Sequence, residues 1–371
     1  MTRIAIIGAG ASGLFLTKKL LEHADCQVYV FERCRNVGTK LRASGGGKAN
    51  LFNEHIDPDG YNHPDAARQL LQQVSPARLR ESFEQMGLTL FSDEEGRVYP
   101  SSQFSQTVVD LLWEPERENC HAILEHEVKH LENREGKWHI DDFHVAFDHV
   151  VLASGTPANM ISKNRKEYNR FLDDLSLTVH PFQPSLVGFT IEDYPKFLAG
   201  CRTRVIADLW QGDRLIHREA GEVTFKEDGI SGIVILNLSA YYNRLPSKEN
   251  CFLQLNLIYH DEHFNAEAHW QRFHTLKGVL HPKLNALYEQ KPFDVNHFKL
   301  KISGTYAIDF AQVCHGGIDL QEVNPDFSLK RFPGLYATGE MLDMDGICGG
   351  YNLFFAFASA LIAYQTITCK P

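Results

Sequence analysis

The feature that most constrains this chain is a glycine-rich turn, Gly8-Ala9-Gly10-Ala11-Ser12-Gly13, near its N-terminus. It follows the apolar run Arg3–Ile7, which predicts a short buried strand. It precedes Ser12–His23, whose leucines recur with helical spacing, and then the β-branched and aromatic run Gln27–Phe31. A strand, a glycine turn, a helix and a second strand in this order predict one βαβ unit of a parallel α/β sheet.

In this context the glycine turn predicts a dinucleotide-binding site. Gly8 permits the tight turn, Gly10 lets a pyrophosphate approach the backbone, and Gly13 lets the helix pack on the strand. The free N–H groups of the helix N-terminus attract the phosphates. Glu32, 19 residues past Gly13, would accept hydrogen bonds from a ribose. The expected cofactor contacts here are Gly8, Gly10, Ala11, Ser12, Gly13, Glu32 and Arg33.

The acid at Glu32 also bears on which nucleotide binds. A 2′-phosphate would meet a carboxylate there, which disfavours NADP. NAD and FAD both carry a free adenosine ribose, so this motif does not separate them. A glycine turn without any ligand is the alternative interpretation.

A second glycine-rich loop, within Gly38–Asn53, favours FAD. Three consecutive glycines flanked by polar residues do not suit the interior of a helix or strand, and they suit a backbone that passes close to a flat ring or a phosphate. Such a second contact loop is more typical of FAD enzymes than of NAD dehydrogenases, and a solvated flexible loop is the alternative. The contacts expected from this loop are Lys40, Ser44, Gly45, Gly46, Gly47 and Asn50.

A third motif lies near the C-terminus. The strand Leu335–Thr338 would bring Gly339 and Glu340 to the middle of the cofactor, and a helix over Tyr351–Ile367 is apolar on nearly all sides. Its buried N-terminus would stabilise the negative charge of a reduced isoalloxazine; a packed helix with a flexible lead-in is the alternative. The remaining expected contacts are Gly339, Glu340, Gly350, Tyr351, Asn352 and Leu353, together with Val128, Ala153, Ser154 and Gly155.

Composition narrows the function further. The net charge of −10 argues against a general polyanion binder, and no apolar run approaches the ~20 residues of a membrane helix. None of the eight cysteines forms a C-x-x-C pair, and the sequence contains no metal-binding motif. The N-terminal apolar run is too short for an export signal. We therefore expect a cytoplasmic protein without a metal. The basic clusters Lys163–Lys166 with Arg170, and Arg202 with Arg204, would contact RNA or be solvated surface charge.

The whole chain resembles the BaiN-like (YhiN-like) family of NAD(P)/FAD-dependent oxidoreductases, also called aminoacetone-oxidase-like flavoproteins. The family pattern K-x-x-x-S-G-G-G-R-C-N-x-T-N matches the second loop, and G-L-Y-x-x-G-E-x-x-D-x-D-G-x-x-G-G-Y-N matches the third motif. Gly221–Phe225 with Gly229–Gly232 resembles a middle signature, G-E-x-x-F-x-x-x-G-I-S-G. The chain departs from these patterns at Lys48-Ala49, Phe52, Lys226-Glu227 and Ile233.

The resemblance implies a Rossmann-like FAD-binding domain of the glutathione-reductase type with a β-rich, barrel-like insert. We expect the FAD-binding domain at residues 1–180 and 310–371, the β-rich insert at 181–262 and 293–309, and a helical segment at 263–292. Asp65–Met86 should be helical, and the stretch from Pro181 to Asn256 should hold short strands with little helix.

The resemblance also implies an activity. FAD would be held non-covalently, NADH or NADPH or another donor would supply hydride transiently, and a conjugated C=C bond of a small molecule would be reduced. The alternatives are reduction of an RNA base of the dihydrouridine type, or a non-catalytic flavin-binding protein, which the departures at Lys48, Ala49 and Glu227 motivate. Tyr351, Glu227 or a bound water would donate the proton, and the catalytic residues and the oligomeric state stay unknown at this stage.

Overall fold

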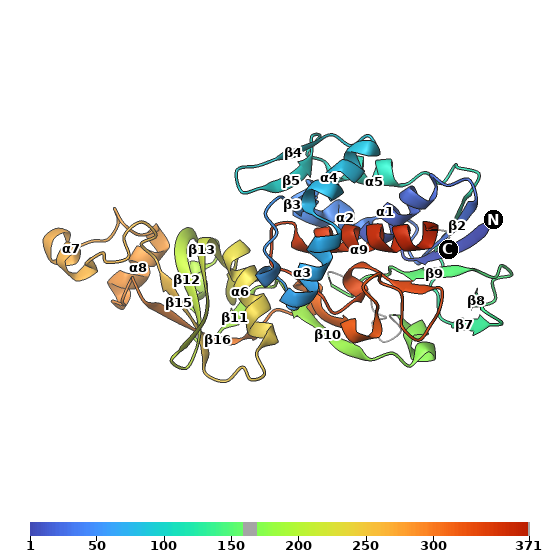
Figure 1. Ribbon diagram of the computed structural model, residues 1–371. Helices are drawn as coiled ribbons and strands as arrows, with labels where there is room; N and C mark the ends of the chain where they lie inside the picture. Colours follow the sequence, from blue (N-terminus) through green and yellow to red (C-terminus); the bar gives the residue numbers. More distant parts are fainter. Residues whose placement is uncertain (159–168, 370–371) are drawn as a thin grey trace. The chain divides into compact units, whose positions relative to one another are not determined.

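The computed structural model describes residues 1–158 and 169–369, and the chain divides into two compact units (Figure 1). Unit 1 contains Met1–Phe182 and Gly316–Pro371, and unit 2 contains Gln183–His315. Each unit encloses its own hydrophobic core. The chain crosses the boundary within β10 (Val179–Ser185) and β17 (Val313–Ile318), which pair as a two-stranded sheet. None of the described helices is long and apolar enough to cross a membrane.

Unit 1 is built on a five-stranded parallel sheet, which confirms the expected Rossmann-like fold. The first βαβ unit lies at its centre, because β1 pairs with β2 on one side and with β9 on the other. The edge strand β18 comes from the C-terminal part of the sequence. The strand order is β18 (Leu335–Ala337), β9 (His149–Leu152), β1 (Thr2–Ile7), β2 (Cys26–Glu32) and β6 (Cys120–Leu124).

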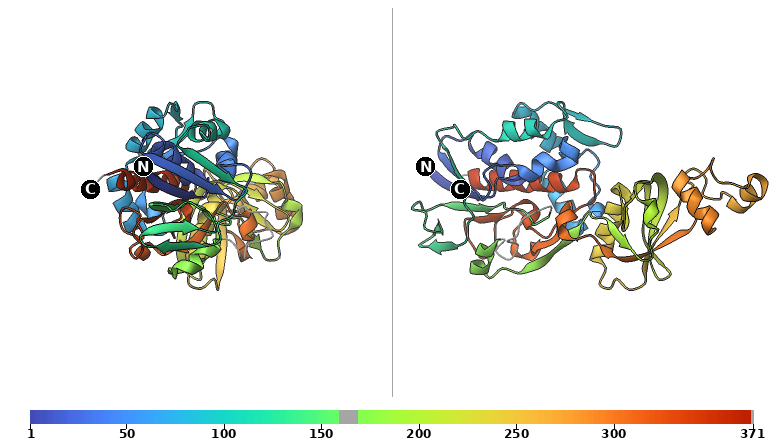
Figure 2. Two further views of the ribbon diagram at one scale, coloured as in Figure 1. Left: turned by 90° about the vertical axis from the view of Figure 1, so that its right-hand side faces the viewer. Right: turned by 180° about the vertical axis from the view of Figure 1, so that it is seen from behind.

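Two buried helices from opposite ends of the sequence pack against each other in unit 1. α1 (Ala11–Leu20) follows the glycine turn, and α9 (Tyr351–Thr368) has most of its side chains buried, as its apolar sequence predicts. α9 lies beside α1 in Figure 1, and Figure 2 shows from two further sides that β1 begins and α9 ends at the same end of the unit. Unit 1 is therefore discontinuous in sequence.

The rest of unit 1 surrounds this sheet with short elements. The helices are α2 (Thr39–Ala43), α3 (Pro64–Gln73), α4 (Pro76–Gln85) and α5 (Ser105–Leu112). The additional strands are β3 (Phe52–Asn53), β4 (Leu90–Ser92) and β5 (Arg97–Pro100) in one sheet, and the hairpin of β7 (Leu131–Arg134) and β8 (Lys137–Ile140). The described 3₁₀ helices of this unit are η1 (Ser44–Gly47), η2 (Pro58–Gly60), η4 (Arg170–Leu175), η7 (Leu320–Glu322) and η8 (Gly339–Met341).

The helical structure expected over Asp65–Met86 is confirmed, and it consists of two helices, α3 and α4. α3 ends before Val74, which is extended. Ser75 then caps α4 by accepting a hydrogen bond from the Arg78 amide at 3.2 Å, and Pro76 occupies the first helical position. Ser-Pro is a helix-start signal that outweighs the continuous apolar periodicity on either side.

Unit 2 is a closed six-stranded antiparallel barrel with attached helices, which confirms the barrel-like insert. Closure leaves no unpaired sheet edge in the barrel. The strands run in the order β11 (Phe189–Ile191), β14 (Gly229–Ser231), β13 (Arg214–Phe225), β12 (Arg202–Gln211), β15 (Cys251–Asn256) and β16 (Phe298–Thr305). The helices α7 (Ala266–Phe273) and α8 (Pro282–Gln290) and the 3₁₀ helices η5 (Lys196–Leu198) and η6 (Ile308–Phe310) complete the unit.

The expectation of little helix between Pro181 and Asn256 is wrong. α6 (Ile233–Arg244) is a well-formed helix that packs on β13. It starts with Ile-Val-Ile-Leu, a β-branched run that resembles a buried strand in sequence. Since most of its side chains are buried, tertiary packing overrides this local preference.

Candidate functional site

The glycine turn after β1 combines two tightly packed glycines with one open glycine. Gly8 has φ +109°, and a Cβ on it would lie 2.5 Å from the carbonyl oxygen of Ala153. A Cβ on Gly13 would lie 2.0 Å from the carbonyl oxygen of Gly8, so any side chain would separate helix from strand. A Cβ on Gly10 would meet nothing closer than 4.0 Å, and no side chain caps α1. The turn therefore presents uncapped amides of the α1 N-terminus to open space.

Glu32 anchors this turn from the end of β2. Its two carboxylate oxygens accept hydrogen bonds from the amides of Ala9 at 2.8 Å and Cys34 at 2.9 Å. A carboxylate can accept about four hydrogen bonds, so a ribose hydroxyl still finds acceptors there. A pocket beside Glu32 brings together five of the predicted contacts, namely Gly8, Glu32, Arg33, Val128 and Ser154.

Three predicted segments meet at the ammonium group of Lys40. Its Nζ donates to Glu340 Oε2 at 2.9 Å, to the carbonyl oxygen of Thr156 at 3.1 Å and to Thr156 Oγ1 at 3.2 Å. A Cβ on Gly155 would lie 3.9 Å from both Lys40 Nζ and Glu340 Oε2. The second loop, the end of β9 and the third motif are thus joined. No pattern in the sequence points to Thr156, which is buried and takes part in this cluster through its hydroxyl group.

The first and third motifs are also in contact. Gly339 has φ +66°, and a Cβ on it would lie 2.8 Å from Ser12 Oγ in the first turn of α1. The Gly339 amide donates to Ser359 Oγ of α9 at 3.0 Å. Gly339 therefore fixes the N-terminal end of α1 against the chain that leads to α9.

The second loop exposes its backbone. Ser44–Gly47 forms the 3₁₀ helix η1, with Gly45 and Gly46 in left-handed conformation. A Cβ on Gly46 or Gly47 would meet no atom within 4 Å. The Asn50 side-chain amide lies 3.0 Å from the Phe52 carbonyl oxygen and 3.2 Å from the Gly350 amide, so this residue connects the loop to α9.

The start of α9 shows the same combination of packed and open glycines. A Cβ on Gly350 would lie 2.4 Å from the carbonyl carbon of Phe52, whereas a Cβ on Gly349 would meet nothing within 4 Å. No side chain caps the helix. Asn352 accepts from the Gly346 amide and donates to the Gly346 carbonyl, both at 2.9 Å, so its side chain holds the preceding loop. Leu353 is half-buried on the first turn.

Tyr351 and Glu227, the two side chains considered as proton donors, lie in very different surroundings. Tyr351 is 7% exposed, its hydroxyl group accepts from the Asp57 amide at 3.2 Å, and burial raises its pKa. A hydroxyl whose pKa is raised releases its proton less readily. Glu227 is exposed in the turn between β13 and β14 of unit 2.

The middle motif serves to close the barrel of unit 2. A Cβ on Gly229 would lie 2.0 Å from the carbonyl oxygen of Phe189 on the neighbouring strand β11. Gly232 has φ +115°, and a Cβ on it would lie 2.6 Å from the carbonyl oxygen of Glu222. Backbone segments approach too closely there for any side chain, so glycine is required at both positions.

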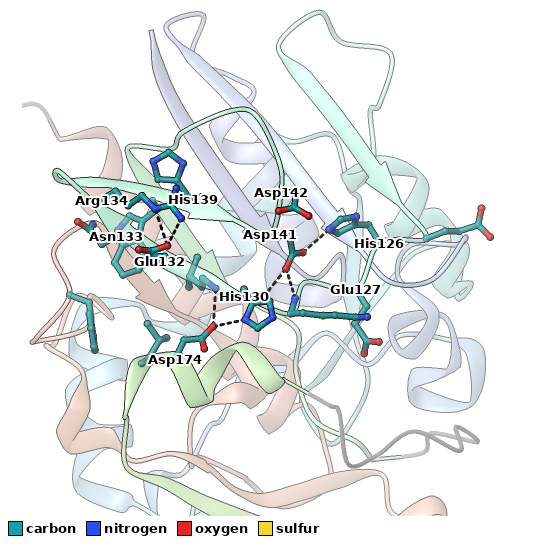
Figure 3. Close-up of a pocket in the computed structure, with 16 residues that line it drawn as sticks. His126, Glu127, His130, Glu132, Asn133, Arg134, His139, Asp141, Asp142 and Asp174 are labelled. Carbon is teal, nitrogen blue, oxygen red and sulfur yellow. Dashed lines mark hydrogen bonds and ion pairs between the residues drawn. The ribbon is translucent and has the colours of Figure 1, made fainter.

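Figure 3 shows a larger polar pocket, formed over the β7–β8 hairpin in unit 1. His126 pairs with Asp141 at 2.9 Å and His130 pairs with Asp174 at 3.3 Å. The two pairs hold the segment on either side of Val128, which lines the pocket beside Glu32. Among the described residues no group of three or more His, Cys, Asp or Glu side chains has the geometry to hold a metal ion.

Only part of the basic clusters lies among the described residues. Lys163–Lys166 lie outside the described residues, and Arg170 follows them as an exposed residue. Arg202 and Arg204 are exposed on β12, where the Arg204 guanidinium lies 5.3 Å from the centre of the Tyr259 ring.

The unit 1 residues fit a dinucleotide cofactor. Open glycine backbone at Gly10, Gly46, Gly47 and Gly349 leaves space where side chains would stand, and two helix N-termini lack side-chain caps. Contacts between Gly339 and Ser12, and between Gly350 and Phe52, bring these turns into one region of the unit. Such backbone is suited to phosphates and to a flat ring.

Comparisons with known proteins agree with this geometry. The family described as HI0933-like protein Rossmann domain matches residues 2–366. A 3-dehydro-bile acid delta(4,6)-reductase of Clostridium scindens is 30% identical over 412 residues, covering 100% of both chains. A ribosomal RNA dihydrouridine synthase of Escherichia coli is 25% identical over 398 residues, covering 98% of this chain and 97% of that protein.

Among solved structures, the fold is similar to that of a 3-ketosteroid delta1-dehydrogenase from Sterolibacterium denitrificans. The TM-score is 0.53 at 11% identity, covering 99% of each chain. Because the family match covers nearly the whole sequence, the chain belongs to the HI0933-like Rossmann family, the oxidoreductase family that its motifs resemble.

Proposed function

We propose that the protein is an oxidoreductase that holds FAD non-covalently in unit 1. The observation that carries this proposal is the meeting of three distant segments at Lys40, Gly155 and Glu340, beside open glycine turns. Packing of a hydrophobic core does not require open, uncapped backbone at several points of one unit.

Different residues of unit 1 would bind different parts of the cofactor. The uncapped amides of α1 would hold the pyrophosphate and Glu32 the adenosine ribose, while Lys40 and Glu340 would hold the middle of the cofactor. FAD, when bound, supplies two-electron redox chemistry. The uncapped N-terminus of α9 beside Gly349 would stabilise negative charge that develops on reduction.

We propose a conjugated C=C bond of a small molecule as the acceptor, with NADH or NADPH as the transient donor. The name of the bile acid delta(4,6)-reductase, similar over its whole length, supports this substrate class. Reduction of such a bond needs one hydride and one proton. Because the Tyr351 hydroxyl is buried with a raised pKa, a bound water is the better proton source in unit 1.

Reduction of an RNA base is the second candidate. It is favoured by the similarity to ribosomal RNA dihydrouridine synthases of Escherichia coli and Haemophilus influenzae, 25% and 24% identical over 98% of this chain. The net charge of −10 weighs against it, because RNA binding relies on phosphate contacts.

The cofactor proposal is tested by the visible absorption spectrum of the purified protein before and after acid release. We expect a yellow protein that releases FAD at about one molecule per chain. A colourless protein that takes up no added FAD would refute the proposal, and released FMN would correct the cofactor.

The substrate proposal is tested with the holoprotein and NADH or NADPH under anaerobic conditions. One arm contains a small conjugated enone and the other an in vitro transcribed uridine-containing ribosomal RNA fragment. Enone-dependent oxidation of the donor with a product two mass units heavier supports the small-molecule assignment. Dihydrouridine formed only in the RNA arm would replace it.

A further inference from the structure

A short segment of unit 1, Gly60–Asn62, runs antiparallel along Asp345–Ile347, in the chain that precedes α9. The Ile347 amide donates to the Gly60 carbonyl at 3.1 Å, and the Asn62 amide donates to the Asp345 carbonyl at 3.0 Å. Tyr61 lies opposite Gly346 in an isolated antiparallel bridge. We call Gly60–Asn62 the clip, since it holds a loop that contains no regular structure of its own.

Asn62 makes most of the polar contacts of the clip. Beyond its backbone bond, Asn62 Oδ1 accepts from the Asp345 amide at 3.0 Å. Its Nδ2 donates to Asp343 Oδ1 at 3.1 Å and to the Asp343 carbonyl at 3.3 Å. Asp343 is 6% exposed, and its Oδ1 also accepts from the Gly316 amide at 3.1 Å. One amide side chain therefore fixes both ends of Asp343–Asp345.

The clip also reaches the helix that follows. The buried Tyr61 hydroxyl donates to the Tyr351 carbonyl oxygen at 2.8 Å, in the first turn of α9. A Cβ on Gly60 would lie 2.6 Å from the Tyr351 ring, so the two segments are in close contact. Asn352 binds Gly346 from the helix side. The loop between Glu340 and α9 is thus held on one side by the clip and on the other by Asn352.

We infer that Asn62 is a positioning residue that sets how the N-terminus of α9 meets the bound flavin; this inference rests on the proposed function. The loop it fixes connects Glu340 to Gly349 and Gly350, the two places where the third motif would contact the cofactor. A helix N-terminus stabilises negative charge only over its first turn, so a small displacement weakens its effect. Fixed dipoles act strongly on a developing charge because they need no reorganisation.

The test compares the flavin midpoint potential of the holoprotein with that of Asn62→Ala, measured by reduction against a dye of known potential. Loss of the side chain releases Asp343–Asp345 and should weaken binding of reduced relative to oxidised flavin about tenfold. For a two-electron couple a tenfold change lowers the potential by about 30 mV. Asn62→Ser keeps a short hydroxyl group and should shift the midpoint potential less. This variant replaces Asn62→Ala in the measurement if the alanine variant does not fold.

Asn119→Ala is the matched control. Its side chain also donates to two backbone carbonyls, of His23 at 3.4 Å and Cys26 at 3.2 Å, on a part of unit 1 outside the proposed flavin site. We expect lower thermal stability in both variants and a shifted potential only for Asn62. An unchanged potential in a flavin-loaded Asn62 variant overturns the inference while leaving the proposed function intact. A wild-type protein that binds no flavin refutes the proposed function and this inference with it.

Discussion

Lys40 Nζ lies 2.9 Å from Glu340 Oε2, although 300 residues separate the two in sequence. The pair connects α2, which leads into the second glycine loop, to η8, which follows β18. The sequence predicts Lys40 as a contact of the cofactor. In the structure the positive charge of Lys40 is paired, so a cofactor there meets a nearly neutral pair with fixed hydrogen-bonding groups instead of a free cation.

This pair should show a measurable coupling energy. We expect Lys40→Met and Glu340→Gln each to destabilise unit 1, and the double variant to cost less than their sum by about 0.5–1 kcal/mol. The figure is modest because the Lys40 side chain is 37% exposed. Urea unfolding of the four proteins measures it, and strictly additive effects would show that the ion pair contributes nothing.

Gly10→Glu should remove cofactor binding without unfolding the protein. Gly10 has φ −86°, which any residue adopts, and no atom lies closer than 4.0 Å to a Cβ there. The added carboxylate would occupy the open side of the turn and repel a pyrophosphate. The ratio of flavin to protein after purification checks this. Gly278→Glu, at an exposed glycine of unit 2 with open surroundings, is the control and should retain full flavin.

Gly232→Ala should destabilise unit 2 and leave flavin content unchanged. The substitution combines a left-handed backbone at φ +115° with a Cβ placed 2.6 Å from the carbonyl oxygen of Glu222. We expect a loss of about 2 kcal/mol or more. Gly212→Ala shares the positive φ but meets no atom within 4 Å, so it should cost about 1 kcal/mol. Chemical unfolding followed by tryptophan fluorescence compares them; equal losses would contradict the close approach.

The titration of His149 should make the free energy of unfolding depend on pH within a narrow range. Burial lowers its pKa below 6.5, and its Nδ1 has no hydrogen-bond partner among the described residues. Below pH 6.5 the unfolded chain therefore binds a proton that the folded chain does not, and stability falls as pH falls through that range. His149→Phe keeps the ring beside Tyr336 and removes the titration. Its stability relative to wild type should be higher at pH 5.5 than at pH 7.5, and a constant difference in thermal midpoint would refute this assignment.

Sequence reasoning succeeded where spacing alone determines the structure. The glycine turn after β1, the parallel sheet and the apolar helix near the C-terminus follow from local patterns, and the barrel that the family resemblance implies is also confirmed. It failed at α6, because an apolar β-branched run suits a buried strand and a buried helix equally. The Lys40–Glu340 pair and the role of Asn62 depend on contacts between distant segments, and neither residue type nor spacing encodes such contacts.

The discontinuity of unit 1 has a consequence for synthesis of the protein. The barrel unit is one uninterrupted stretch, Gln183–His315, and each of its strands finds its partners within that stretch. The first βαβ unit leaves the ribosome long before β18 and α9, which complete its sheet and cover α1. Because domains generally fold as units, we expect the barrel to form on the nascent chain before the sheet of unit 1 is complete. If FAD binds unit 1 as proposed, we expect it to bind late, and we expect a chain truncated before α9 to form the barrel but not the proposed flavin site.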